Sequence, residues 1–271
     1  MDIPGRQSEI VKLARSQGRV TVDDLARRFE VSAQTIRKDL NDLCERRALT
    51  RVHGGAVVAS GVENLAYAAR RFVAAAEKRA IGAATAALIP NGCSLFINIG
   101  TTTEEVARAL SSHEGLLVIT NNLNVAMQLY PHPRMEVIVA GGTVRRADGA
   151  VVGEASNNLI QQFKVDYAVI GASAIDAEGA LLDFDYREVQ AAQAIIANAR
   201  NVILVADSTK FNRTAPVRIG HIRQIQTFVT DRSLPSALHK IAQDCGVTVI
   251  EALDKLGHAE GLNQDYPQAA P

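Results

Sequence analysis

The sequence predicts an α/β protein in two parts: a small N-terminal winged helix-turn-helix domain and a larger domain built around a parallel sheet. Residues 1–58 show short helical patterns followed by a hairpin pattern, and residues from about 79 onward alternate between strand-like and helical segments. The 271 residues are also about the length of two domains. We expect a winged helix-turn-helix domain at 1–58, a linker at 59–78, an α/β domain at 79–256 and a flexible tail at 257–271.

The composition excludes several classes of protein. Apolar residues make up 47%, which is enough for a core and too many for a disordered chain. No apolar stretch approaches the roughly 18 residues of a membrane span, and the N-terminus has no apolar signal core. The three cysteines lie far apart, without a zinc-like or disulfide-like spacing. We therefore expect a cytoplasmic protein with no membrane contact, no metal and no cofactor.

The first elements in the chain are helices. An apolar stripe at helical spacing surrounds Ile10, and Gly18 ends that pattern. Thr21, with Asp24 three residues later, is typical of a helix N-cap, and Ser32 is a second N-cap candidate. Two short helices joined by a tight turn predict a helix-turn-helix.

A hairpin pattern follows the helices. Residues 49–53 have the composition of a strand, Gly54-Gly55 that of a tight turn, and residues 56–58 that of a returning strand. A helix-turn-helix followed by a small hairpin is a winged helix. Residues 1–58 hold 11 Lys+Arg against 8 Asp+Glu, although the whole chain has zero net charge.

The second helix of a helix-turn-helix presents its N-terminal residues to base edges in the major groove. Gln suits adenine and Arg suits guanine, while hydroxyls and Lys suit phosphate oxygens. The candidate DNA-binding residues are Ser32, Gln34, Thr35, Arg37 and Lys38 on this helix, with Arg51 and His53 on the wing. The alternative is an amphipathic helix pair with merely solvated charges; the wing and the positive strip favour double-stranded DNA.

Seven strand-like runs and five helical patterns alternate in the larger part. The strands are expected at 94–99, 116–120, 136–140, 167–171, 202–206, 227–230 and 247–250. The helices are expected at 103–110, 123–130, 155–163, 186–199 and 234–244. Apolar strands alternating with helices predict a largely parallel sheet that is covered on both faces.

One motif in this part suits an anion. Gly100, Thr101, Thr102 and Thr103 follow a strand and open a helix. Glycine allows close backbone approach, free N–H groups at a helix start favour an anion, and three hydroxyls add donors. Phosphate is the natural ligand, and an ordinary helix cap is an equally good interpretation of this motif alone.

Other polar residues follow later strands, where ligands gather in open α/β sheets. They are Thr120, Asn121, Asn122, Gly141, Gly142, Gly171, Asp185 and Lys210. Each alone is ordinary turn or cap chemistry. Their recurrence at strand ends predicts a ligand site, to which Lys210 contributes a cation. A polar cluster opens the helix expected at 186–199 and suits either sugar hydroxyls or capping of that helix, with capping favoured; its members are Asp183, Asp185, Tyr186, Arg187 and Glu188.

These motifs resemble a known family. Residues 31–40, followed by 51–56, resemble the DeoR-type bacterial transcriptional regulators. The Gly-Thr-Thr, Thr-Asn-Asn, Gly-Gly and Asp-Ser-Thr-Lys motifs are similar to the sensor of that family. The resemblance implies a sensor fold similar to ribose-5-phosphate isomerase that binds phosphorylated sugars or related metabolites.

Three further runs indicate the subgroup. Residues 95–102, 121–126 and 184–189 are most similar to family members that respond to glycerol-3-phosphate. Asn98 stands where the family usually has Asp, which puts any role of a carboxylate there in doubt.

The resemblance implies a repressor that leaves operator DNA when a phosphorylated metabolite, above all glycerol-3-phosphate, fills the sensor, and that works as a homo-oligomer, dimer or tetramer. A different sugar-phosphate effector is one alternative. A sugar-phosphate isomerase with an extra domain is another, but residues 171–176 lack the acidic run that those enzymes carry. We therefore expect no catalytic residues.

Overall fold

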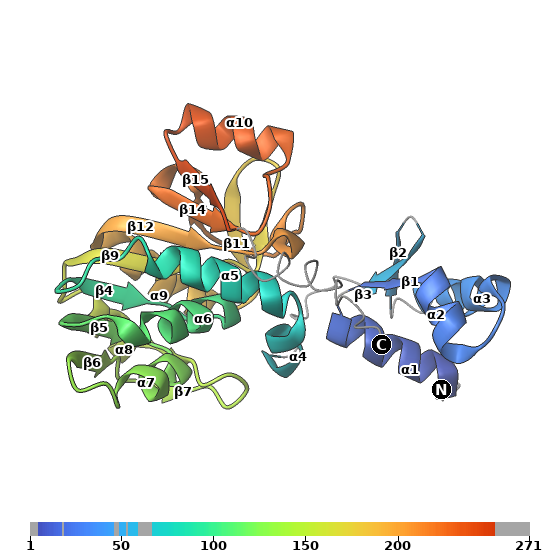
Figure 1. The fold of residues 1–271 in the computed structure, drawn as a ribbon, viewed down its shortest axis with the longest axis horizontal. Coiled ribbons are helices and arrows are strands. Elements are labelled where there is room, and N and C mark those ends of the chain that lie inside the picture. The colour runs from blue at the N-terminus through green and yellow to red at the C-terminus, as the bar shows by residue number, and fades with distance from the viewer. Residues whose placement is uncertain (1–4, 18, 46–48, 53, 59–66, 253–271) are drawn as a thin grey trace, which may run out of the picture.

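The computed structural model describes residues 5–17, 19–45, 49–52, 54–58 and 67–252. The predicted tail at 257–271 and the wing residue His53 lie outside these ranges. Figure 1 shows a smaller body that ends with β3 and a larger body that begins with α4. The boundaries of the two domains stay a prediction.

Three helices and a three-stranded sheet form the smaller body. Its helices are α1 (Gly5–Gln17), α2 (Val22–Phe29) and α3 (Ala33–Glu45), and its sheet has the order β1 (Arg19–Thr21), β3 (Gly55–Val58), β2 (Leu49–Val52). The predicted helix cap is confirmed, because the Thr21 side chain accepts the N–H of Asp24 at 3.2 Å. The short strand β1 was not predicted.

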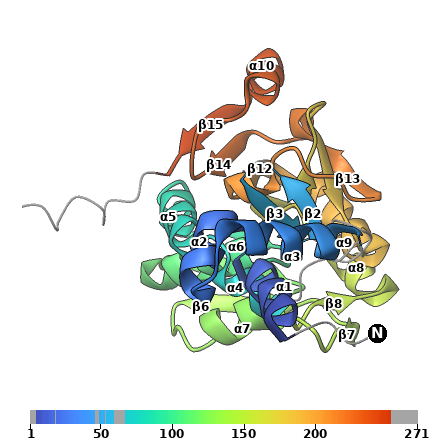
Figure 2. The same cartoon turned by 90° about the vertical axis from the view of Figure 1, so that its right-hand side faces the viewer.

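Gly55 is required where β3 meets β1. A Cβ atom at this position would lie 2.0 Å from the carbonyl oxygen of Val20, closer than any side chain tolerates. The predicted Gly-Gly turn therefore does two things: it reverses the chain, and it lets the wing lie against the strand that precedes the first helix of the helix-turn-helix. Figure 2 looks at this body from its own side, with the larger body behind it.

The larger body is built on a seven-stranded parallel sheet. Its strands are β4 (Ser94–Ile97), β5 (Leu116–Thr120), β6 (Met135–Val139), β9 (Val165–Ile170), β12 (Ala199–Val205), β14 (Thr227–Thr230) and β15 (Thr248–Glu251). Their order is β15-β14-β12-β9-β4-β5-β6, and every neighbouring pair is parallel. The order reverses between β4 and β9, so the loops after these strands flank the crevice where such sheets bind ligands.

Two hydrophobic cores lie on the two faces of this sheet. The first contains Leu95 and Ile97 and is covered by α5 (Ala75–Ala86), α6 (Thr101–Ala109) and α7 (Leu123–Leu129). The second contains Phe96 and is covered by α8 (Glu154–Ile160), α9 (Tyr186–Ala197) and α10 (Ser236–Asp244). Alternate residues of one strand thus enter opposite cores. All seven predicted strands and five predicted helices are present.

A second sheet was not predicted. It is antiparallel, in the order β10 (Ala174–Ile175), β11 (Ala180–Asp183), β13 (Val217–His221), and a further hairpin pairs β7 (Thr143–Val144) with β8 (Val151–Val152). Most of these strands have two to four residues, which is too short for a periodic signal. The second sheet matters because β11 ends at Asp183, beside the pocket described below.

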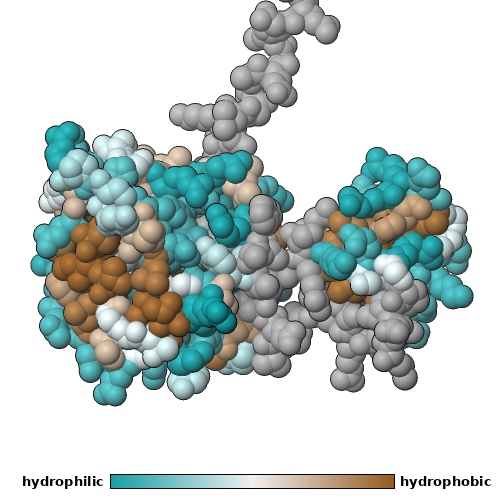
Figure 3. All heavy atoms as spheres, turned by 90° about the horizontal axis from the view of Figure 1, so that it is seen from below, coloured by the Kyte–Doolittle hydropathy of each residue, from teal (hydrophilic) through white to brown (hydrophobic). Residues whose placement is uncertain are grey.

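An apolar patch lies on the outer surface of the larger body. Figure 3 shows apolar side chains gathered on the underside of this body, where Figure 1 places α7 and β6. Large apolar side chains exposed in or beside these elements include Met127 of α7 and Val139 of β6. None of the helices in the described ranges combines the length and apolar character needed to cross a bilayer.

Candidate functional site

The N-terminal half of α3 has the exposure expected of a DNA-reading helix. Gln34, Arg37 and Lys38 are exposed, while Ile36 and Leu40 are completely buried in the core of the smaller body. Ser32 precedes the helix and accepts the N–H of Thr35 at 3.1 Å. The predicted polar face is therefore free of the core. Arg51 lies in β2 of the wing.

Asp39 connects α3 to α1. Its buried carboxylate accepts hydrogen bonds from Arg6 Nε at 2.6 Å and from Gln7 Nε2 at 3.2 Å, both on α1. Sequence analysis missed this role, because a single Asp on a polar helix face carries no signal. The ion pair fixes the orientation of α3 relative to α1, and so the direction in which Arg37 points.

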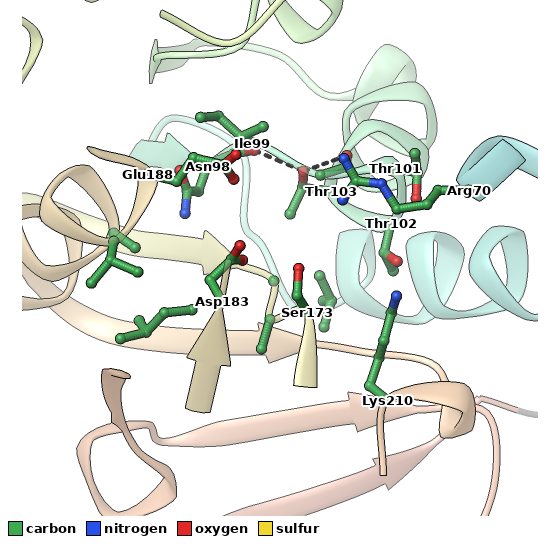
Figure 4. Close-up of a pocket in the computed structure, with 17 residues that line it drawn as sticks. Arg70, Asn98, Ile99, Thr101, Thr102, Thr103, Ser173, Asp183, Glu188 and Lys210 are labelled. Carbon is green, nitrogen blue, oxygen red and sulfur yellow. Dashed lines mark hydrogen bonds between the residues drawn. The ribbon is translucent and has the colours of Figure 1, made fainter. Parts of the chain in front are cut away.

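A pocket lies in the larger body, where β4 and β9 end and α6 and α9 begin. Of the predicted metabolite-binding residues, it is lined by Gly100, Thr101, Thr102, Thr103, Gly171 and Lys210 (Figure 4). Segments more than 100 residues apart in sequence thus meet at one site, because the carboxyl ends of neighbouring parallel strands share one edge of the sheet.

The start of α6 presents unpaired backbone donors to the pocket. Its first helical hydrogen bond runs from the Glu104 N–H to the Gly100 carbonyl, at 3.0 Å, so the N–H groups of Thr101, Thr102 and Thr103 have no acceptor within the helix. Gly100 has a φ of 150°, a conformation that favours glycine. This helix end favours a negative charge.

The Thr103 hydroxyl has a structural role. It donates to the carbonyl oxygens of Asn98, at 2.7 Å, and Gly100, at 2.8 Å, and the residue is completely buried. It therefore holds the loop that the pocket depends on. Three hydroxyls were expected to face a ligand. The Thr103 hydroxyl is used within the loop, so this residue has only its backbone N–H to offer a ligand. The hydroxyls of Thr101 and Thr102 are available for contacts with a ligand.

Cationic side chains gather on one side of the pocket. Lys210 points toward Thr102, and Arg70 reaches in from α4 (Tyr67–Phe72) (Figure 4). Burial lowers the pKa of Lys210 to about 8; Asp207 opposes the shift, while the nearby Arg213, Lys78 and Arg70 add to it. The cations near Lys210 outnumber the Asp207 carboxylate, so this side of the pocket has an excess of positive charge that an anion would neutralise.

Acidic and amide groups line the opposite side. Asp183, Glu188 and Asn98 lie across the pocket from Lys210 (Figure 4). Burial and the neighbouring Asp183 raise the pKa of Glu188 to about 7, although the Arg145 guanidinium that pairs with it opposes the shift. The buried Asn98 Oδ1 has no hydrogen-bond partner among the described residues. These are acceptors for hydroxyl groups.

The pocket therefore has two chemically different sides. Backbone N–H groups, Lys210 and Arg70 suit a phosphate, and the carboxylates of Asp183 and Glu188 suit hydroxyls that donate hydrogen bonds. A small phosphorylated polyol has both kinds of group in one molecule.

Six predicted metabolite-binding residues do not line this pocket: Thr120, Asn121, Asn122, Gly141, Gly142 and Asp185. Thr120 donates to the Ile97 carbonyl at 2.7 Å, and Asn122 caps α7 and donates to Glu104 at 3.1 Å. These bonds connect β5 to β4 and the start of α7 to α6. Thr120 ends β5 and Asn122 follows it, one strand away from the crevice between β4 and β9.

The remaining residues of this group also have local roles. Asn121 donates to the Val151 carbonyl, and a Cβ atom at Gly142 would lie 2.7 Å from the Val152 carbonyl oxygen. Gly141 is exposed in the same hairpin region. Asp185 caps α9 and pairs with Arg145 at 2.9 Å, so the favoured interpretation, capping, describes its observed contact.

Four further side chains line the pocket: Arg70, Ser173, Asp183 and Glu188. Arg70 and Ser173 were not predicted as binding residues, and for the cluster that contains Asp183 and Glu188 the binding of sugar hydroxyls was the less favoured alternative to capping. Nothing in the spacing of that cluster distinguishes the residues that cap α9 from those that enter the pocket. Arg70 falls within the predicted linker, and its α-helical environment gives no sign of a site.

The low pKa of Lys210 predicts how metabolite binding depends on pH. An ammonium with a pKa of about 8 loses its charge above pH 8, and a bound anion raises that pKa, so binding takes up a proton. Affinity for a phosphorylated polyol should change little between the pKa of Glu188, about 7, and the pKa of Lys210, about 8, and should fall by up to about tenfold per pH unit above pH 8. Calorimetry between pH 7.5 and 9.5 measures this slope.

Lys210→Arg is the matched control, since a guanidinium stays charged up to about pH 12. This variant should bind with a flat profile over the same range. An unchanged slope in Lys210→Arg would assign the titration to another group.

Comparisons with known proteins agree with this geometry. The family model of the DeoR-like helix-turn-helix domain matches residues 6–62, and that of the DeoR C-terminal sensor domain matches residues 73–232. The chain is 43% identical over 239 residues to the glycerol-3-phosphate regulon repressor of Escherichia coli (strain K12), covering 88% of this chain and 95% of that protein.

Two further comparisons are with a second repressor and with a solved structure. The chain is 42% identical over 245 residues to the HTH-type transcriptional repressor CsqR of Escherichia coli (strain K12), covering 90% of this chain and 94% of that protein. Ribose 5 phosphate isomerase A from Neisseria gonorrhoeae matches with a TM-score of 0.36 and 12% identity, covering 49% of this chain and 52% of that one. That likeness is too weak to bear on function.

Proposed function

Because the chain belongs to the DeoR family of transcriptional regulators, we propose that it is a cytoplasmic repressor whose grip on operator DNA is weakened by glycerol-3-phosphate. Its relatives are repressors and not enzymes. The observation that carries the metabolite assignment is the two-sided pocket, with Lys210 and the start of α6 on one side and Asp183 and Glu188 on the other.

Operator reading is assigned to α3. Gln34 and Arg37 are exposed and have the donor patterns that suit adenine and guanine edges. Phosphate contacts are assigned to Ser32, Thr35 and Lys38. Arg51 and His53 of the wing extend these contacts. A homo-oligomer with two-fold symmetry would read two half-sites about one turn of DNA apart or a multiple of it.

A surface on the larger body supports the oligomer. Strand β6 is the last strand of its sheet, and Val139 of β6 and Met127 of α7 are exposed. Figure 3 shows apolar side chains gathered on this side of the body. Apolar patches next to an open strand edge favour association with another chain. A dimer or a tetramer formed through this or another surface would satisfy the symmetry of an operator.

The phosphate of glycerol-3-phosphate is assigned to Lys210, Arg70 and the N–H groups of α6. Its two hydroxyls are assigned to Asp183 and Glu188, whose ionised forms accept hydrogen bonds from hydroxyl groups. In this arrangement Asn98, where the family usually has Asp, leaves the net charge of the pocket more positive. A neutral amide at this position is compatible with an anionic ligand.

A second effector should be tested because the chain is 42% identical to the repressor CsqR and 43% identical to the glycerol-3-phosphate regulon repressor. Release of operator DNA by glycerol-3-phosphate, a hexose phosphate and inorganic phosphate should be compared in a mobility-shift assay. Glycerol-3-phosphate should act at the lowest concentration. Release by the hexose phosphate alone would reassign the effector, and release by none of the three would refute the proposed function.

A further inference from the structure

Helix α4 contacts both bodies of the molecule. It lies against α1 of the smaller body and against α6 of the larger body, whose first turn forms part of the pocket (Figure 1). On the pocket side, the Tyr67 hydroxyl donates to Glu104 at 2.7 Å and accepts from Asn124 Nδ2 at 3.0 Å. A helix in this position is able to transmit a change at the pocket to the DNA-reading body.

Arg70 is the side chain of α4 that enters the pocket. Only 15% of it is exposed, and its Nε is buried without a hydrogen-bond partner among the described residues. The acidic group nearest to it is Asp148, 3.7 Å from one terminal nitrogen, which is too long for a hydrogen bond. The guanidinium therefore has donors that an anion in the pocket would satisfy.

Asp148 is already paired with another arginine. Arg145 binds it through Nε, at 2.9 Å, and through Nη2, and also pairs with Glu188 on the acidic side of the pocket. Asp148 thus loses little if Arg70 leaves it. The ion pairs from Arg70 through Asp148 and Arg145 to Glu188 connect both sides of the pocket to α4.

The backbone at Arg70 is held firmly. The ammonium of Lys78 on α5 is buried and donates to the carbonyl oxygens of Arg70, at 2.5 Å, and Val73, at 2.7 Å. These bonds link α4 to the larger body, so the reach of the Arg70 side chain into the pocket depends on where α4 lies. A ligand that draws the guanidinium inward therefore favours one position of α4 over another.

We propose that Arg70 is the residue through which the bound metabolite acts on operator binding. The phosphate takes the guanidinium from Asp148, and α4 shifts against α1 in response. This inference rests on the proposed function and adds to it a separation of roles, in which Lys210 binds the metabolite while Arg70 both binds it and transmits its presence.

The test compares operator affinity without and with saturating glycerol-3-phosphate in four proteins: wild type, Arg70→Gln, Lys210→Gln and Arg71→Gln. Saturation of each is established by calorimetry. The ratio of the two operator affinities, taken within each protein, is the coupling factor, so a change in basal affinity does not affect it. Arg71 is the exposed neighbour of Arg70 on the same helix and is the matched control.

The wild type should show a coupling factor of about 5 to 150. Arg71→Gln should keep this factor, and Lys210→Gln should need more metabolite but reach a similar factor at saturation. Arg70→Gln should fall to within about twofold of no coupling although its pocket is filled, with the wild-type factor as the reference. Arg70→Lys, which keeps a charge without the planar fork, should retain part of the coupling.

Two results would overturn the inference in different ways. A saturated Arg70→Gln protein that keeps the wild-type coupling factor would exclude Arg70 as the transmitting residue while leaving the proposed function intact. A wild-type protein that shows no coupling at all would remove the proposed function and the inference together.

Discussion

Replacing Lys210 with alanine is expected to produce a repressor that stays on its operator at glycerol-3-phosphate concentrations that release the wild type. The ammonium lies on the cationic side of the pocket and points toward the start of α6, where we place the phosphate. Removing one member of a buried charge pair costs about 2–5 kcal/mol, which corresponds to a loss of at least about 30-fold in metabolite affinity. Calorimetry with glycerol-3-phosphate measures the loss directly.

Lys240→Ala is the control for this variant, since Lys240 is exposed on α10, away from the pocket. It should bind the metabolite as the wild type does, and both variants should bind operator DNA in its absence. If Lys210→Ala responded to the metabolite at the wild-type concentration, the phosphate side of the pocket would have to lie elsewhere.

Replacing Arg37 with alanine is expected to weaken operator binding by about 1–3 kcal/mol, or roughly 5- to 150-fold, and to relax the preference for one base pair. Arg37 is exposed on α3, about one helical turn from Gln34, and the ion pair between Asp39 and Arg6 holds α3 against α1. Competition assays with operators altered at single positions measure both effects.

Lys38→Ala provides the comparison for Arg37→Ala. If Lys38 contacts a phosphate, its loss should weaken binding to all sequences by a similar factor and reduce the salt dependence of the affinity. Unchanged operator affinity in Arg37→Ala, with an unchanged base preference, would remove Arg37 from the reading face of α3.

The regular part of the fold was predictable from periodicity. Each strand of the parallel sheet carries several apolar residues in succession because it is buried on both faces, and the helices between the strands repeat their apolar residues every three or four positions. The cap at Thr21 was predictable because it depends only on local sequence: its side chain bonds to the backbone of its own helix.

The acidic side of the pocket could not be predicted because it depends on tertiary placement. Asp183 enters the pocket at the end of β11, in a short antiparallel sheet without a periodic signal. Asp185, two residues later, caps α9 and pairs with Arg145 instead. Residues 183–188 thus divide between pocket and cap according to how α9 packs, which local sequence does not contain.

Arg70 illustrates the same limit at longer range. Its short helix is polar and Ala-rich, like a linker, and its role follows only from the contact of α4 with the start of α6. Conversely, Thr120 and Asn122 had the composition of a ligand site and lie one strand too far from the crevice. Predicting which strand ends form a site requires the strand order, and here the reversal between β4 and β9 decided it.

We propose that bound glycerol-3-phosphate and bound operator DNA favour different conformations of the same molecule. The most direct measurement is a closed thermodynamic cycle on the wild type: operator affinity with and without glycerol-3-phosphate, and glycerol-3-phosphate affinity with and without operator DNA. Each ligand should weaken the binding of the other by the same factor, about 5- to 150-fold. A factor of one on both arms, with the metabolite demonstrably bound, would contradict it.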